Sequence, residues 1–158
     1  MAATTLLHRF LLMCAATAFD TPHDHWSHRL PPLRAALSPT EARENIRTIY
    51  DGIIDVRMSA EHRLEGRIVD SICIPAQLWE HGMYLPRDEF VPDVLEQFET
   101  DCRLLCVCGD GRRSELAAQQ LEQEGFAVDY IDGGLDAWAE QSLELEVEDD
   151  GGLVGSYV

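Results

Sequence analysis

One cysteine of the chain stands where a nucleophile would be expected. Cys108 follows an apolar run and precedes residues 109–114, which read GDGRRS. The backbone N–H groups of such a glycine-rich loop, together with the positive end of a following helix, favour a thiolate over a thiol. A thiolate is the nucleophilic form of cysteine. The segment therefore predicts a reactive cysteine; the alternative is a glycine-rich turn around a buried, inert cysteine.

The loop after this cysteine supplies the other parts of a candidate site. Gly109 and Gly111 can adopt positive φ, which lets the loop wrap tightly with its amides inward. Arg113 can hold an anionic substrate or steady the loop, and Arg112 adds positive surface charge. Ser114 is expected to cap the helix that follows.

The elements that must position this loop are indicated by capping and apolar patterns. Residues 38–41 (SPTE) combine a capping hydroxyl, a proline at the first helical position and a glutamate three residues after the cap, which predicts a helix from residue 39. Short apolar runs predict buried strands. In chain order we expect a helix at 39–50, strands at 52–57 and 68–74, a loop at 76–87, a helix at 92–99, a strand at 104–108, a helix at 114–124, a strand at 127–131 and a helical turn at 136–140.

The alternation of these elements predicts the fold class and the division of the chain. Strands that are apolar on both faces and alternate with helices indicate an α/β domain with a parallel sheet covered on each side. Ligands of such sheets bind beyond the carboxyl ends of the strands, where Cys108 would lie. We expect an extension and linker at 1–36, the α/β domain at 37–142, and a loosely held, acidic, glycine-rich tail at 143–158.

Charge and composition exclude some partners. The 158 residues include 29 acidic and 12 basic side chains, and the net charge of −17 disfavours nucleic acids and anionic membrane surfaces. All basic residues are arginine, which fits either a salt-adapted source or a GC-rich genome. The five cysteines are irregularly spaced, so we expect a reducing, cytoplasmic location.

The N-terminal residues offer an alternative location. The uncharged run 10–19 is too short to span a bilayer, so no membrane span is expected. It suits the apolar part of a targeting segment within residues 1–19, which would export the protein or direct it to an organelle. A short amphipathic helix is the other interpretation.

Four ordered motifs resemble a single-domain rhodanese, a sulfurtransferase family. They are the Cys-x-x-Gly-x-Arg-Ser pattern at 108–114, the segment GGLDAW at 133–138, IDVR at 54–57, and the stretch 65–75. The resemblance covers residues 38–141 and implies a three-layer sandwich with a five-stranded parallel sheet and helices on both faces. Two positions depart from the family pattern, since Arg67 and Ser71 stand where histidine and alanine are usual.

The resemblance also implies roles for the candidate residues. Cys108 would be the catalytic nucleophile, while Asp55 and Arg57 would support the neighbouring loops. No metal and no organic cofactor are implied. The substrate-binding set would be Gly109, Asp110, Gly111, Arg112, Arg113 and Ser114.

Loop length distinguishes the reactions open to this family. Four residues separate Cys108 from Arg113, as in the sulfurtransferases, whereas related arsenate reductases and phosphatases have five. We therefore expect an enzyme that moves a sulfane sulfur from thiosulfate or another persulfide donor to a thiol or cyanide through a Cys108 persulfide. A persulfide-bearing protein is a further candidate partner, and the oligomeric state stays open. The alternatives are a non-enzymatic binding or sulfur-carrier module and, less favoured, an arsenate reductase or phosphatase that uses Cys106 with Arg112.

Overall fold

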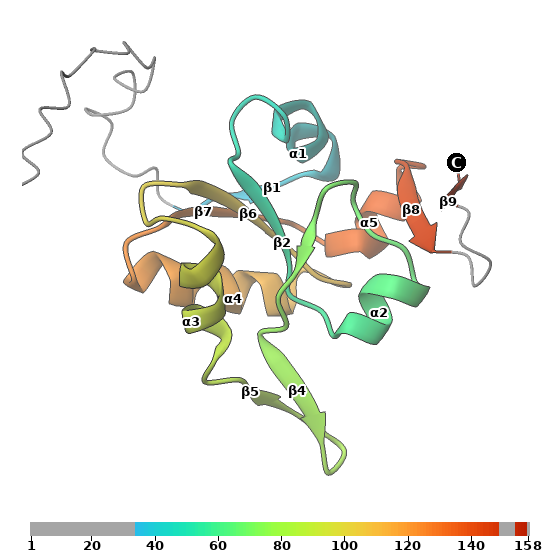
Figure 1. The fold of residues 1–158 in the computed structure, drawn as a ribbon. Helices are drawn as coiled ribbons and strands as arrows, with labels where there is room; N and C mark the ends of the chain where they lie inside the picture. Colours follow the sequence, from blue (N-terminus) through green and yellow to red (C-terminus); the bar gives the residue numbers. More distant parts are fainter. Residues whose placement is uncertain (1–33, 149–153, 158) are drawn as a thin grey trace, which may run out of the picture. The chain divides into compact units, whose positions relative to one another are not determined.

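The computed structural model describes residues 34–148 and 154–157 (Figure 1). The apolar run at 10–19 and its expected targeting role lie outside the described residues. None of the helices in the described ranges is both long enough and apolar enough to cross a membrane.

Five parallel strands form the central sheet in the order β1-β7-β6-β2-β3, as expected (Figure 1). The side chains of β6 from Leu104 to Val107 are all fully buried, which is the pattern of a strand covered on both faces. The strands are β1 (Ala36–Leu37), β2 (Gly52–Asp55), β3 (Ile72–Cys73), β6 (Arg103–Val107) and β7 (Ala127–Ile131).

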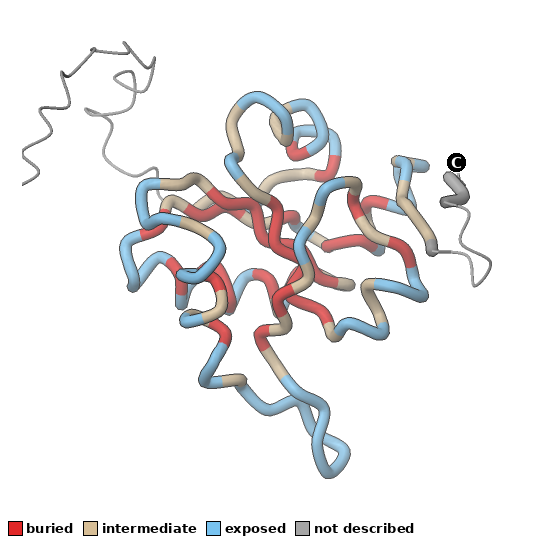
Figure 2. Tube along the Cα trace, viewed as in Figure 1, coloured by how far each residue is buried: buried red, intermediate tan, exposed pale blue. Residues whose placement is uncertain are grey.

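Helices cover both faces of this sheet and divide the core into two apolar clusters. On one face, α3 and α4 contribute Phe90 and Leu121; on the other, α1 and α5 contribute Ala42 and Trp138. Figure 2 shows the buried centre between the layers. Each large side chain buried in this way contributes about 1.5–3 kcal/mol to folding. The helices are α1 (Pro39–Asn45), α2 (Ser59–Leu64), α3 (Phe90–Gln97), α4 (Arg112–Gln123) and α5 (Gly134–Glu140).

Helix α1 begins as its capping sequence predicts. The Ser38 hydroxyl accepts the N–H of Glu41, and the Glu41 carboxylate accepts the N–H of Ser38. The helix ends at Asn45, earlier than the predicted residue 50, and turns follow. The β-branched residues at 46, 48 and 49 favour helix less than the residues before them.

The expectation of a loop at 76–87 is wrong. Strands β4 (Gln77–Glu80) and β5 (Met83–Pro86) form an antiparallel hairpin that extends from the domain (Figure 1). The two turn residues, His81 and Gly82, have φ of 51° and 80°, as a tight hairpin turn requires. Most residues of the hairpin are exposed (Figure 2), so the hairpin lacks the alternation of buried and exposed residues that marks a half-buried strand.

The expected loose tail is also wrong for residues 145–148. Strand β8 (Leu145–Glu148) pairs with β9 (Val154–Tyr157), and Glu146 exchanges two backbone hydrogen bonds of 2.8 Å with Arg67. The acidic composition of this segment gives no strand signal, and one of its two pairing partners, Arg67, is distant in sequence. The predicted strand at 68–74 is reduced to β3, since Asp70 adopts a positive φ of 64° and interrupts it.

Candidate active site

Cys108 lies directly after β6, at the carboxyl end of the sheet where the sequence places it. The chain then makes a tight loop into α4. Gly111, at φ 88°, is the N-cap of α4, and a Cβ there would approach the Gly133 nitrogen to 2.9 Å. The prediction that Ser114 caps the helix is therefore wrong. Ser114 lies in the first turn, where its hydroxyl donates to the Gly111 carbonyl at 2.9 Å.

The sulfur of Cys108 faces the beginning of α4. The Ser114 N–H donates to Cys108 Sγ at 3.3 Å, and the Cys108 thiol donates to Ser114 Oγ at 3.4 Å. Asp110 Oδ1 is 3.9 Å from the sulfur. The sequence predicts several inward amides, whereas Ser114 supplies the single backbone donor on this sulfur among the described residues.

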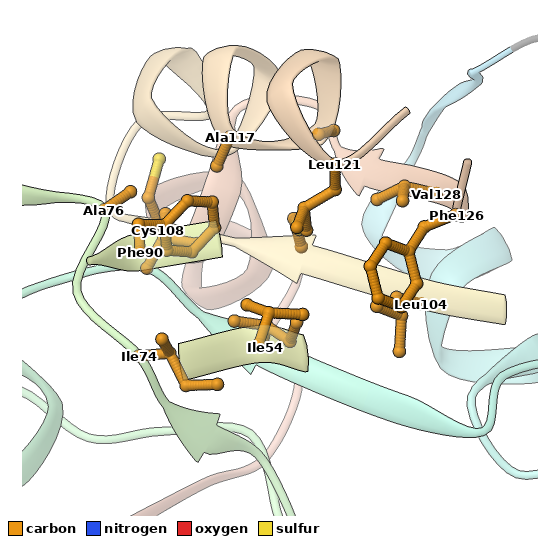
Figure 3. Packing of buried hydrophobic residues seen from close by; sticks show 14 residues of the cluster. Ile54, Ile74, Ala76, Phe90, Leu104, Cys108, Ala117, Leu121, Phe126 and Val128 are labelled. Carbon is orange, nitrogen blue, oxygen red and sulfur yellow. The ribbon is translucent and has the colours of Figure 1, made fainter. Parts of the chain in front are cut away.

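Cys108 is fully buried in this arrangement. Figure 3 shows it beside Ala76 and Phe90, with its sulfur on the side of the sheet that carries α4. Because no part of the side chain is exposed, a covering group must move before a reactant can reach the sulfur.

The start of α5 holds the loop from the other side. Leu135 N–H donates to the Cys108 carbonyl at 2.8 Å, and Asp136 N–H donates to the Gly109 carbonyl at 2.9 Å. A Cβ on Gly134 would lie 2.3 Å from the Cys108 carbonyl oxygen, so only glycine fits there. Since the C=O and N–H groups of a peptide unit point in opposite directions, these bonds turn the N–H groups of Gly109 and Asp110 away from α5.

Arg113 is held in a two-point ion pair. Its Nη1 and Nη2 donate to the Glu61 carboxylate at 2.9 and 2.7 Å, and both side chains are only 16% exposed. The guanidinium also lies 5.2 Å from the centre of the Tyr84 ring, on the hairpin. Hydrogen bonding to Glu61 raises the pKa of Arg113 further above its usual value. Burial alone raises the pKa of Glu61, but hydrogen bonds from Arg113 and the Met58 N–H outweigh it and the pKa is lowered.

The second arginine of the loop is paired as well. Arg112 Nε donates to Asp110 Oδ2 at 2.6 Å, and its backbone N–H donates to Asp110 Oδ1 at 3.2 Å. The Arg112 side chain is 85% exposed, so solvent screens this pair strongly. The hydrogen bond from the Arg112 side chain lowers the pKa of Asp110. Both arginines expected to meet an anionic substrate are therefore occupied by carboxylates of the chain.

Asp55 and Arg57 form a buried pair at the carboxyl end of β2. Arg57 donates to both Asp55 carboxylate oxygens, at 3.0 and 2.8 Å, and to the Gly66 carbonyl at 2.6 Å. Both residues are at most 1% exposed. These bonds join the end of β2 to residue 66 and fix the segment between them, which carries Glu61.

Glu61 and Tyr84 are the site residues that sequence reasoning missed. Glu61 has a local signal, because its carboxylate accepts the Met58 N–H at 2.9 Å, the position of a helix-capping glutamate. Tyr84 could have been found from the His81-Gly82 turn, which places it opposite Trp79. Neither signal says that these side chains meet Arg113.

The surroundings of the loop include a groove beside Arg113. It has a volume of about 410 Å³ and is lined by Gln77, Pro86, Arg113, Leu116 and Gln120, among others. Cys108 does not line it. Across the described ranges, no three His, Cys, Asp or Glu side chains gather in a way that could hold a metal ion.

The remaining described cysteines have no comparable surroundings. Burial raises the pKa of the thiols of Cys73, Cys102 and Cys106. Cys106 lies inside β6 and is fully buried, so the alternative register that pairs Cys106 with Arg112 places the sulfur inside the core. All four described cysteines are free thiols.

Curated proteins of known activity match part of the chain. Two matches are the thiosulfate sulfurtransferase GlpE of two Vibrio cholerae strains, each 42% identical over 53 residues. These residues make up 33% of this chain and 50% of GlpE, so the match spans about half the length of these relatives.

Solved structures and a family model match a larger share. A rhodanese-related protein from Thermoplasma volcanium is 26% identical with a TM-score of 0.57, over 72% of this chain and 97% of that protein. A rhodanese-like domain protein from Staphylococcus aureus shares the fold at 24% identity and a TM-score of 0.56, over 74% and 100% of the two chains. The family model described as "Rhodanese-like domain" matches residues 38–141. With this match over more than half of its length and the parallel sheet described above, the chain belongs to the rhodanese-like domain family.

Proposed function

We propose that this protein is a sulfurtransferase that carries a sulfane sulfur as a persulfide on Cys108. The observation that carries the proposal is the position of this sulfur. It lies at the carboxyl end of β6, with the Ser114 N–H donating to it at 3.3 Å from the first turn of α4. The family and the partial match to a thiosulfate sulfurtransferase support the same chemistry.

The reaction would proceed in two substitutions at sulfur. In the first, the Cys108 thiolate bonds to the outer sulfur of a donor such as thiosulfate, and the donor's S–S bond breaks so that sulfite leaves with the electron pair. In the second, an acceptor thiolate or cyanide attacks the outer sulfur of the Cys108 persulfide and restores the Cys108 thiolate. Atoms and charge balance in each step, so neither needs an oxidant, a reductant or a cofactor.

The loop would stabilise the negative charge that stays on sulfur throughout. The N–H of Ser114 already points at the Cys108 sulfur, and the twelve-residue helix α4 directs its positive end toward it. Fixed backbone donors of this kind lower barriers because they are oriented before the reaction begins.

Thiocyanate formation from thiosulfate and cyanide tests the proposal. We expect the wild-type protein to turn over, and the Cys108→Ser variant to lose at least 99% of the activity because no persulfide can form. Cys102→Ser is the matched control, since it removes a partly buried thiol that precedes β6. Turnover by Cys108→Ser would contradict the proposal.

Two rival functions give different results in the same preparation. A non-enzymatic binding module would form no thiocyanate with any donor. A phosphatase or arsenate reductase would hydrolyse a chromogenic phosphate ester or reduce arsenate. The four-residue spacing between Cys108 and Arg113 favours the sulfurtransferase, as does the position of Cys106 within β6 rather than in the loop that follows the strand.

The proposal includes a reducing compartment and a thiol acceptor. A persulfide relay needs free thiols, and the described cysteines are free. The acceptor is either a small thiol or a cysteine of a partner protein.

A further inference from the structure

We infer that Glu61 is a specificity-determining residue that prevents Arg113 from serving as an anion-binding group. The site would thereby prefer donors whose leaving group carries one negative charge, such as organic persulfides and thiosulfonates, over thiosulfate, whose leaving group is dianionic sulfite. This inference rests on the proposed function and names the substrate class of the same site.

The charges around the loop cancel in pairs. Arg113 faces Glu61 in a two-point pair, and Arg112 faces Asp110. Two positive and two negative side chains give a local net charge of zero within a chain of net charge −17. A dianion arriving at Cys108 therefore meets no uncompensated arginine of this loop.

The pair between Glu61 and Arg113 is held in place from several sides. The Glu61 carboxylate is fixed by the Met58 N–H at 2.9 Å. The segment that carries it is tied down by Arg57, which is bonded to Asp55 and to the Gly66 carbonyl. A bidentate pair between fixed, mostly buried groups is not readily exchanged for a solvated dianion, because both groups were desolvated when the pair formed.

Arg113 is further restrained on its open side. Its guanidinium packs against the Tyr84 ring at 5.2 Å, and this ring contacts Trp79 edge-on at 4.7 Å between ring centres. Apart from Arg113 itself, which is paired with Glu61, the groove is lined by amide and apolar side chains and carries no carboxylate. This lining suits the organic part of a donor better than it suits a small, strongly hydrated dianion.

The first step with such donors balances in the same way as with thiosulfate. With an organic persulfide R–S–SH, the Cys108 thiolate bonds to the outer sulfur, the donor S–S bond breaks, and R–S⁻ leaves with the electron pair. With methanethiosulfonate the leaving group is methanesulfinate, which carries one charge. Methanethiosulfonate and thiosulfate are similar in shape and differ in total charge by one, so this pair of donors isolates the effect of charge.

The test compares the kcat/KM ratio of thiosulfate to methanethiosulfonate in three proteins. Glu61→Gln removes the charge but keeps an oxygen for the Met58 N–H. Glu124→Gln is the charge-matched control, because this exposed carboxylate lies just beyond the far end of α4, about 18 Å along the helix. We expect the ratio to rise about tenfold or more in Glu61→Gln and to stay within twofold of wild type in Glu124→Gln. An unchanged or lower ratio in Glu61→Gln would overturn the inference, as would an equal rise in both variants.

A double variant identifies the group that thiosulfate gains. In Glu61→Gln/Arg113→Met the tenfold gain should disappear, because the released guanidinium is gone. If the gain persists without Arg113, the assigned role of Glu61 is wrong. If Glu61→Gln does not fold, as judged by circular dichroism, the ionic-strength dependence of the wild-type protein still tests the inference. Its kcat/KM for thiosulfate should increase with ionic strength more than that for methanethiosulfonate, and a decrease would reveal an unpaired cation at the site.

Failure of the proposed function has a different signature. In that case none of the three proteins transfers sulfur from either donor. Transfer from both donors with a ratio insensitive to residue 61 would refute the inference alone.

Discussion

Replacing Gly134 with alanine tests whether the start of α5 fixes the reactive loop. Gly134 has a φ of 58°, and an added Cβ would lie 2.3 Å from the Cys108 carbonyl oxygen and 2.4 Å from that of Gly109. The left-handed conformation costs an alanine about 1–2 kcal/mol. Forcing a methyl group into a packed site adds about 1–3 kcal/mol. We expect Gly134→Ala to lower the free energy of unfolding by about 2–5 kcal/mol.

Gly125→Ala is the matched control for this variant. Gly125 also has a positive φ, 98°, but a Cβ there meets no atom within 4 Å. In Gly125→Ala the free energy of unfolding should therefore fall only by the cost of the left-handed conformation, about 1–2 kcal/mol. Urea denaturation measures the free energy of unfolding of both variants.

Activity gives a second measure of the same contact. Displacing the carbonyls of residues 108 and 109 moves the Cys108 sulfur, and a shift of about 1 Å can reduce the rate about 100-fold. Gly134→Ala should therefore form the persulfide much more slowly than Gly125→Ala at a temperature where both are folded. Equal stability losses and equal rates in the two variants would refute the view that α5 clamps this loop.

Three further predictions concern charge. Arg57→Leu leaves the Asp55 carboxylate buried without its partner, so the free energy of unfolding should fall by about 3–5 kcal/mol; a loss below about 1 kcal/mol in urea denaturation would show that the pair is not structural. The pKa of Glu61 is lowered from 4.5 in the folded state, so its stabilising effect is present above about pH 4.5 and is lost as the pH falls through the lowered value. The difference in unfolding midpoint between wild type and Glu61→Gln should accordingly shrink on acidification, and a difference that grows instead would reverse the assigned sign. Wild-type kcat/KM for thiosulfate should rise from low to molar salt as repulsion from the net charge of −17 is screened, which a flat profile would contradict.

The sequence predicts the elements whose signals are local. The strand at Ala127–Ile131 has the expected bounds, and α1 starts at Pro39 because its capping box is complete within four residues. The place of Cys108 in the fold is predicted correctly for the same reason, since an apolar strand, a glycine loop and a helix follow one another directly.

The missed features depend on contacts between distant segments. The Glu61–Arg113 pair joins residues 52 positions apart, and no pattern around either residue indicates the other. Strand β8 pairs with β9 and also forms a bridge from Glu146 to Arg67, 79 residues earlier, which no local pattern indicates. The hairpin of β4 and β5 lacks the buried face that makes a strand recognisable, although its turn residues signal it.

Peptide mapping by mass spectrometry after brief incubation with a sulfane-sulfur donor tests the central claim most directly. We expect a mass increase of about 32 Da, one sulfur atom, on Cys108 and on none of Cys73, Cys102 and Cys106. The label should disappear when a thiol acceptor is added. A persulfide on another cysteine with Cys108 unmodified would contradict the account.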